Sequence, residues 1–272
     1  MIGQPVDSHP LNLARPFAPH RLKVYLGGLM VLTLFTLIPT IGCEVGFIKP
    51  TFTVDVIGNI VLAFPSWLVP LVVLWDAPGE SRTPLQKGAE LILVWLPFTA
   101  FSQLVYELTF LIGNIFGTWT DTSDPGWKWL WWQFSLADTR WWGNNAYMFA
   151  LELVAVPVGA MLLLIWIRLL RTTTSTEARI RGLWFAYSGI AILLATTSIY
   201  FVSEVRTGFA DIGQGWYGLA FKFIFINLPF LAVPPFVLYA IYGQVDFLTR
   251  RAGVREHIQT AVASADRAQD AG

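Results

Sequence analysis

The sequence predicts an all-α membrane protein, a bundle of six transmembrane helices, with five as the alternative. Of its 272 residues, 55% are hydrophobic and only 13% are charged, whereas soluble domains carry roughly a quarter of charged residues. Apolar runs recur at about the 20 residues that a helix needs to cross a bilayer. Each run is expected to be helical, because lipid offers no partner to unpaired backbone groups. The expected spans are 24–44, 56–75, 91–115, 146–168, 183–203 and 217–242.

The alternative of five spans arises at the first run, where Pro39 and Gly42 lie near the end. Positive charges favour six spans with both termini in the cytoplasm, because thirteen of the eighteen Lys and Arg side chains then fall on the cytoplasmic side. Lys222 falls inside the sixth run. Four segments result: a cytoplasmic N-terminal tail, an additional helix with its loop, the main membrane domain, and a polar cytoplasmic C-terminal tail forming a short helix with a frayed end. They cover 1–23, 24–54, 55–245 and 246–272.

Charge and metal-ligating residues exclude several classes of function. The net charge is zero, so no basic surface is expected to bind nucleic acid. Cys43 is the single cysteine, and His9, His20 and His257 lie in the expected tails or at their edges, so we expect neither a disulfide nor a metal centre.

Two glutamates inside apolar runs are the main candidates for chemistry, because a carboxylate at bilayer depth is costly. Glu107 and Glu152 are expected at similar depth on adjacent, antiparallel spans, where they could face each other. Two carboxyl groups in one apolar site are suited to general acid and general base roles. Gln103 lies one turn before Glu107, and Asn227 precedes prolines that should break the sixth helix. The alternative for each polar residue is a hydrogen bond that joins helices.

Two further features allow structural and functional interpretations. Glu204 and Arg206 could form an ion pair at the membrane interface or belong to a binding site. Seven tryptophans lie in the loop 118–145, where they are typical of a segment at the membrane surface but could also form an aromatic wall that holds a cation. They are Trp119, Trp127, Trp129, Trp131, Trp132, Trp141 and Trp142.

Three stretches resemble the emopamil-binding protein family, membrane sterol Δ8–Δ7 isomerases that share the EXPERA domain with the sigma-2 receptor. The stretches FSLADTRWWGNNAYMFALELVAVPVGAML, IYFVSEVRTGF and YGLAFKFIFINLPF carry the resemblance, which covers roughly 55–245. Its marks are the run Asp138-Thr139-Arg140, Glu152, the run from Glu204 to Phe209, and Asn227. The resemblance implies a bundle of five membrane helices around a cavity for a lipid-like ligand, and makes the first span an addition.

The resemblance also implies a reaction and its residues. Glu107, Glu152 and Asn227 would be catalytic: an alkene is protonated, aromatic rings and carboxylates hold the carbocation, and a proton leaves another carbon, without a cofactor. Gln103 stands where the family has its catalytic His, Ala155 where it has Thr, and Phe230 where it has Trp. The implied membrane is the endoplasmic reticulum in a eukaryote. The substrate-binding set would be Gln103, Tyr106, Trp142, Ala155, Tyr200, Glu204 and Phe230.

Three functions therefore stay open. The first is an isomerase or cyclase of a sterol-like, terpenoid or polyene substrate, in sterol or specialised-metabolite biosynthesis. The second is a sterol-binding or lipid-binding membrane protein, or a chaperone, without catalysis. The third, a transporter or structural protein, lacks support because the sequence shows no repeated halves. The expected partners are a hydrophobic small molecule and membrane lipid, and a homodimer is left open.

Overall fold

The computed structural model describes residues 17–119, 125–142, 145–171 and 173–270. Its regular structure is helical, and this part of the chain contains no strand beyond an isolated bridge between Asp138 and Ile212. Six helical stretches are long and apolar enough to cross a membrane, which confirms the all-α membrane bundle and gives six candidate spans rather than five. They are α1 (Pro19–Glu44), α2 (Phe52–Val73), α3 to α4 (Pro84–Ile115), α6 (Ala146–Leu170), α7 (Thr176–Thr207) and the stretch Tyr217–Val254.

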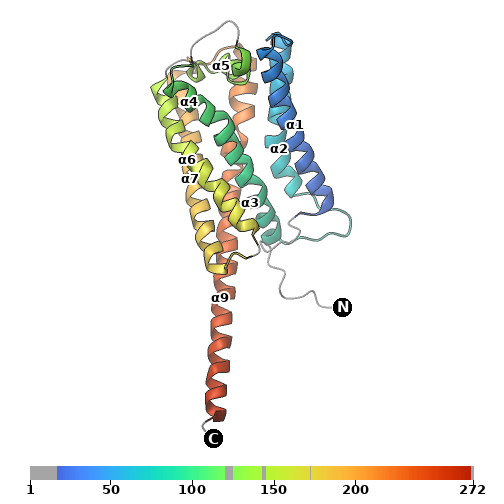
Figure 1. Ribbon diagram of the computed structural model, residues 1–272, viewed down its shortest axis with the longest axis vertical. Helices are drawn as coiled ribbons and strands as arrows, with labels where there is room; N and C mark the ends of the chain where they lie inside the picture. The colour runs from blue at the N-terminus through green and yellow to red at the C-terminus, as the bar shows by residue number, and fades with distance from the viewer. Residues whose placement is uncertain (1–16, 120–124, 143–144, 172, 271–272) are drawn as a thin grey trace.

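Four of the helices form a ring in which each contacts the next: α3 (Pro84–Phe101), α6, α7 and α9 (Pro234–Asp270). The pair α1 and α2 lies beside this ring, with α2 against α3 (Figure 1). A short helix, α5 (Trp129–Ser135), lies across one end of the bundle, which we call the capped end. At the opposite end α9 projects well beyond the other helices (Figure 1).

Both expected tails contribute to long helices. Because α1 begins at Pro19, the last part of the expected tail 1–23 is helical, while residues 1–16 lie outside the described part of the chain. At the other end α9 continues without a break to Asp270, so the expected short, separate C-terminal helix is wrong. The boundaries predicted at 23 and 246 therefore both fall within helices.

Local sequence explains where several helices begin and end. At the start of α3 the Thr83 side chain accepts a hydrogen bond from the Gln86 N–H, and the Gln86 side chain bonds back to the Thr83 N–H. Asn145 caps α6 by accepting from two backbone N–H groups. The helix α7 ends at Gly208, whose φ of +67° is a left-handed conformation that glycine adopts without strain.

The third and sixth spans each contain a π-helical segment: η1 (Ser102–Glu107), which joins α3 to α4 (Leu108–Ile115), and η4 (Tyr217–Phe225). Beyond η4 the sixth span continues as α8 (Pro229–Ala232) and then α9, so the break expected from the prolines is confirmed. Single π-helical turns within α-helices are frequent at functional sites.

The buried core divides into two clusters of different composition. The cluster inside the ring, on the side away from the cap, is mainly aliphatic, with Trp95, Leu162 and Ile241 among its members. The cluster beneath the cap is mainly aromatic and includes Trp129 and Phe223. The aromatic rings therefore gather under α5, which is where the candidate site lies.

Candidate functional site

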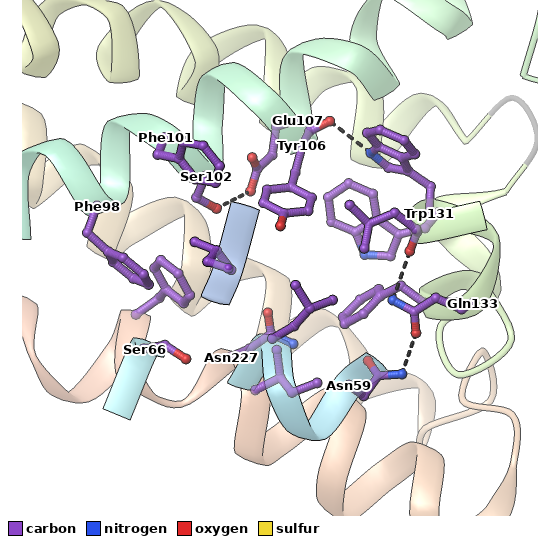
Figure 2. A pocket seen from close by; sticks show the side chains of 17 residues that line it. Asn59, Ser66, Phe98, Phe101, Ser102, Tyr106, Glu107, Trp131, Gln133 and Asn227 are labelled. Atoms are coloured by element: carbon purple, nitrogen blue, oxygen red, sulfur yellow. Dashed lines mark hydrogen bonds between the residues drawn. The ribbon is translucent and has the colours of Figure 1, made fainter. Parts of the chain in front are cut away.

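A cavity of about 150 Å³ lies between α2, η1, α5 and the start of the α8 region (Figure 2). Most of its wall is apolar, and aromatic rings form a large part of it. The first helix also contributes to the wall, so α1 belongs to the site architecture. The lining residues are Leu32, Asn59, Leu62, Ser66, Phe98, Phe101, Ser102, Tyr106, Glu107, Leu130, Trp131, Gln133, Phe134, Trp141, Ile226, Asn227 and Phe230.

Glu107 is the carboxylic acid of this cavity. The Ser102 hydroxyl donates a hydrogen bond of 3.0 Å to Glu107 Oε1 (Figure 2). These residues are five positions apart, a spacing that the wider turn of η1 brings to one side of the helix. Glu107 Oε2 is shielded from solvent and has no hydrogen-bond partner among the described residues. One oxygen is thus held and the other is left unpaired.

Glu152, the second expected catalytic acid, lies on α6 and is buried, with 7% of its surface exposed. Its carboxyl group is within electrostatic reach of the Glu107 carboxyl, so the structure brings together the two acids that the sequence placed at similar depth. Glu152 does not line the cavity, and its Oε2 also lacks a partner in the described part of the chain. The cavity therefore has one acid on its wall and a second within electrostatic reach of the first.

Gln103 is directed toward α6 rather than into the cavity. A Cβ atom added to Gly159 would lie 3.0 Å from Gln103 Cγ and closer still to Gln103 Cβ, so the glycine permits a close approach of η1 to α6. Gln103 does not line the cavity, and its Oε1 has no partner within the described ranges. The contact between Gln103 and Gly159 is the packing that brings η1 against the helix of Glu152.

Asn227 lines the cavity, but its amide nitrogen serves its own helix. Nδ2 donates to the carbonyl oxygens of Lys222 at 3.2 Å and Phe223 at 2.8 Å. The π-helical segment and Pro229 disturb the regular backbone bonding here, and the side chain replaces part of it. Neither a catalytic contact nor the structural alternative, a hydrogen bond that joins two helices, describes this nitrogen, because both of its acceptors lie in its own span.

Two other expected substrate-binding residues line the cavity. The Phe230 ring stacks on Phe98, with centroids 5.8 Å apart, and forms apolar wall. The Tyr106 hydroxyl lies 3.1 Å from Thr36 Oγ1 on α1. Since Thr36 donates to the Leu32 carbonyl, Tyr106 is the donor to Thr36.

Part of the cavity wall is polar and is formed by Asn59 on α2 and Gln133 on α5. The sequence alone did not single out these two residues as candidates for the site. Asn59 Nδ2 lies 2.5 Å from Gln133 Oε1 (Figure 2). Behind them Lys222 and Asp55 form a buried ion pair of 2.7 Å, with 0% and 1% of their side chains exposed. The signal was present in the sequence, because Asp55 and Asn59 are one turn apart in the second span and Lys222 interrupts the sixth.

Tyr200 and Glu204, also expected to bind substrate, do not line the cavity. The Glu204 carboxylate forms an ion pair of 2.9 Å with Arg140, and the Tyr200 hydroxyl donates to Asp138. The expected ion pair between Glu204 and Arg206 is therefore wrong, because Arg140 reaches Glu204 from the loop under the cap and Arg206 is exposed. Tyr200 and Glu204 thus hold the loop that carries Asp138 and Arg140 against the end of α7.

The tryptophans of the loop 118–145 occupy three kinds of position: cavity wall, buried core and, for Trp127, the exposed surface. Trp131 and Trp141 line the cavity, whereas Trp129, the first residue of α5, is fully buried. Trp142, expected to bind substrate, packs on Trp119 outside the cavity lining. Ala155, the other expected binding residue, is buried in the aliphatic core. Residues 120–124 and 143–144 of this loop lie outside the described part of the chain.

The described residues contain no group of three or more His, Cys, Asp and Glu side chains placed to hold a metal ion. Comparisons of the chain with family models, curated proteins and solved structures returned no significant match. The fold and the site define a multi-pass α-helical membrane protein with an aromatic cavity that carries a carboxylic acid.

Proposed function

We propose that this protein is a membrane isomerase or cyclase that acts on a sterol-like, terpenoid or polyene substrate. Glu107 donates a proton to an alkene of the substrate, and the Glu107 carboxylate that this step leaves accepts a proton from another carbon of the cationic intermediate. The observation that carries the proposal is the Glu107 carboxyl group on the wall of an aromatic cavity, with Glu152 within electrostatic reach.

Two carboxyl groups in a low-dielectric site do not readily ionise together. One group of the pair can therefore stay protonated while the other is ionised, which keeps a proton available for transfer. Glu107 lines the cavity and is assigned the transfer to the substrate, while Glu152 modulates the charge of Glu107 from α6. The hydrogen bond from Ser102 orients the Glu107 carboxyl group.

The aromatic wall suits the intermediate. Ring faces attract a cation within about 6 Å of the ring centroid without acting as nucleophiles that would trap it. Phe98, Phe134, Trp131 and Trp141 supply such faces around the cavity. The resemblance to sterol isomerases agrees with this chemistry, and Gln103 in place of their His favours a substrate other than the housekeeping sterol.

A second candidate is a sterol-binding or lipid-binding membrane protein without turnover. One observation favours it: Gln103 and Glu152, both expected at the reaction centre, do not line the cavity. The same apolar cavity would then hold a ligand without a full set of acid and base groups.

The test is incubation of the purified protein in D₂O with a Δ8 sterol and a panel of polyene and epoxide terpenoids, followed by mass spectrometry. We expect deuterium in an isomerised or cyclised product. Glu107→Gln should lower turnover by about 100-fold or more, the usual contribution of a general acid, while ligand affinity changes little. Glu177→Gln is the matched control, because Glu177 is an exposed acid on α7.

The outcomes separate the two candidates. Turnover that survives in Glu107→Gln would contradict the assignment of the acid. No product from any substrate, with sterols or terpenoids bound equally by wild type and variant, would leave the binding protein as the function.

A further inference from the structure

We propose that Asn59 accepts a hydrogen bond from a hydroxyl group of the ligand, so that the cavity selects alcohols over the matching ketones and ethers. The inference rests on the proposed function in one respect, that the cavity is the ligand site. It adds a recognition group and an orientation for the substrate.

Most donors on the cavity wall are already used within the protein. Apart from any proton on Glu107, each lining side chain with a polar hydrogen has at least one acceptor in the described part of the chain. The second N–H hydrogen of Gln133 Nε2 is the donor for which the described residues supply no acceptor, so a ligand that only accepts hydrogen bonds finds few partners at this wall. The bonds already made are Ser66 to Ala63 O, Ser102 to Glu107 Oε1, Tyr106 to Thr36 Oγ1, Trp131 to Tyr106 O, Gln133 to Leu130 O, Trp141 to Tyr200 Oη, and the amides of Asn59 and Asn227 described above.

The unpaired atoms are acceptors. Of the polar atoms on lining side chains that are shielded from solvent, Asn59 Oδ1 and Glu107 Oε2 have no partner among the described residues. Asn59 is 1% exposed, so bulk solvent does not reach its side chain. A buried acceptor without a partner is costly, and a ligand hydroxyl that supplies the donor removes this cost.

The orientation of the Asn59 amide is fixed by its neighbours. Its nitrogen lies within hydrogen-bond distance of the Asp55 backbone oxygen at 2.7 Å, Asp55 Oδ1 at 2.9 Å and Gln133 Oε1. All three are acceptors, so the nitrogen must face them and the oxygen must face away. Figure 2 shows this geometry, with the Asn59 nitrogen on the side of Gln133.

The ion pair behind Asn59 keeps this arrangement in place. Lys222 Nζ binds Asp55 Oδ1 at 2.7 Å and also donates to the backbone oxygen of Gln133. It thereby joins α2, α5 and η4 at one point. Asn59 is thus held directly by α2 and α5, and Lys222 of η4 fixes both of its partners before any ligand arrives, which is the preorganisation that a selective polar contact needs.

One other group competes for Asn59. The Tyr217 hydroxyl lies close enough to the Asp55 and Asn59 side chains to interact with both, although no hydrogen bond of good geometry joins them in the described ranges. Tyr217 does not line the cavity. A small movement of Tyr217 would pair the two groups without a ligand, so the experiment includes a variant that removes this hydroxyl.

The wall of Asn59 and the acid Glu107 come from different elements, α2 and η1. Figure 2 shows Asn59 and Glu107 on opposite sides of the cavity, so a ligand with its hydroxyl at Asn59 presents another part of its carbon skeleton to Glu107. The expected substrate class is a rigid or extended apolar alcohol whose reacting double bond is separated from the hydroxyl by part of the carbon skeleton.

The experiment measures equilibrium binding of matched ligand sets to the full-length protein in lipid nanodiscs. Each set contains an alcohol, its carbonyl analogue and its methyl ether: one set on a saturated 3-hydroxysteroid and one on farnesol. We expect the alcohol to bind about tenfold more tightly than either analogue, the factor typical of pairing one buried acceptor. In Asn59→Leu and in the shorter Asn59→Ser the preference should fall to about twofold or less.

Two variants are controls. Asn114→Leu changes an asparagine on α4 that does not line the cavity and whose amide nitrogen donates to Phe110 O of its own span, so the preference should stay. Tyr217→Phe should also leave it unchanged. Loss of the preference in Tyr217→Phe would overturn the proposal in favour of the tyrosine.

The remaining outcomes are equally decisive. Equal affinity of wild type for alcohol, ketone and ether overturns the role of Asn59, and so does a preference that persists in both Asn59 variants. The comparison on wild type stands even if a variant fails to fold. Turnover in D₂O without any preference for alcohols would overturn this inference alone, whereas the absence of binding by every ligand set would overturn the cavity as the ligand site.

Discussion

The hydroxyl of Tyr200 donates a hydrogen bond of 2.5 Å to the carboxylate of Asp138. Arg140 binds the same carboxylate through two nitrogens, at 2.8 and 2.6 Å, and its guanidinium carbon lies 4.6 Å from the centroid of the Tyr200 ring. Burial alone would lower the pKa of the Arg140 guanidinium, but Asp138 and Glu204 hold this pKa above its usual value. The group stays charged and fastens the loop under the cap to α7.

We therefore predict that Tyr200→Phe destabilises the protein by about 2 kcal/mol, the contribution of a hydrogen bond to a charged group. Ligand affinity should stay within a few-fold of wild type, because Tyr200 does not line the cavity. Unfolding in detergent and ligand binding, measured on one preparation, check both. Tyr239→Phe, at a tyrosine that is 78% exposed, is the control. Lost binding at unchanged stability would instead assign Tyr200 to the ligand.

Lys222→Met should destabilise the protein by about 3 to 5 kcal/mol, because it leaves the Asp55 carboxylate buried without its cation. The double variant Lys222→Met/Asp55→Asn should recover a large part of the loss, since the unpaired charge is gone. A double-mutant cycle with Asp55→Asn, followed by thermal unfolding in detergent, measures the coupling. Additive losses would show that the two residues do not depend on each other.

The contacts between α1 and the loop after α2 should weaken in acid. The hydrogen bond from Arg21 lowers the pKa of the Glu80 carboxyl to about 2, from an ordinary value of 4.5. A depressed pKa in the folded state stabilises the protein above pH 4.5, and this stabilisation is lost as the pH falls toward 2.

Glu80→Gln should accordingly lower the unfolding temperature at pH 6 and have a progressively smaller effect as the pH approaches 2. A series of melting curves across this range checks the prediction. Glu177→Gln removes an exposed carboxylate and should have little effect at any pH. A constant difference between wild type and Glu80→Gln would contradict the role of the Arg21 contact.

Gly159→Ala should separate η1 from α6, because its new methyl group would overlap Gln103. We expect a destabilisation of about 1 to 3 kcal/mol, as for other overpacked cores, together with reduced turnover in the D₂O assay. Gly27→Ala is the matched control on α1, where an added Cβ meets nothing within 4 Å, and it should stabilise the helix slightly. Normal activity in Gly159→Ala would show that this approach does not matter to the site.

The sequence predicted the membrane bundle well because its signals are long and additive: each span is an apolar run, and the prolines after Asn227 break the sixth one as expected. Glu107 and Asn227 were found because a polar side chain stands out in such a run. Asn59 and Gln133 were missed because their role depends on contacts between helices far apart in the sequence. Glu204 was assigned the wrong partner for the same reason, since Arg140 reaches it across the fold.

The π-helical turn at η1 amounts to one residue inserted into an α-helix, and each residue advances such a helix by about 100°. Removing one residue before Glu107 would restore regular α-helical bonding there, at the cost of turning the carboxyl group about a quarter of a circle away from the cavity. Placement of the acid thus depends on chain length as well as on residue identity, so a relative of this protein could keep a glutamate in this span and still lose the acid from the wall.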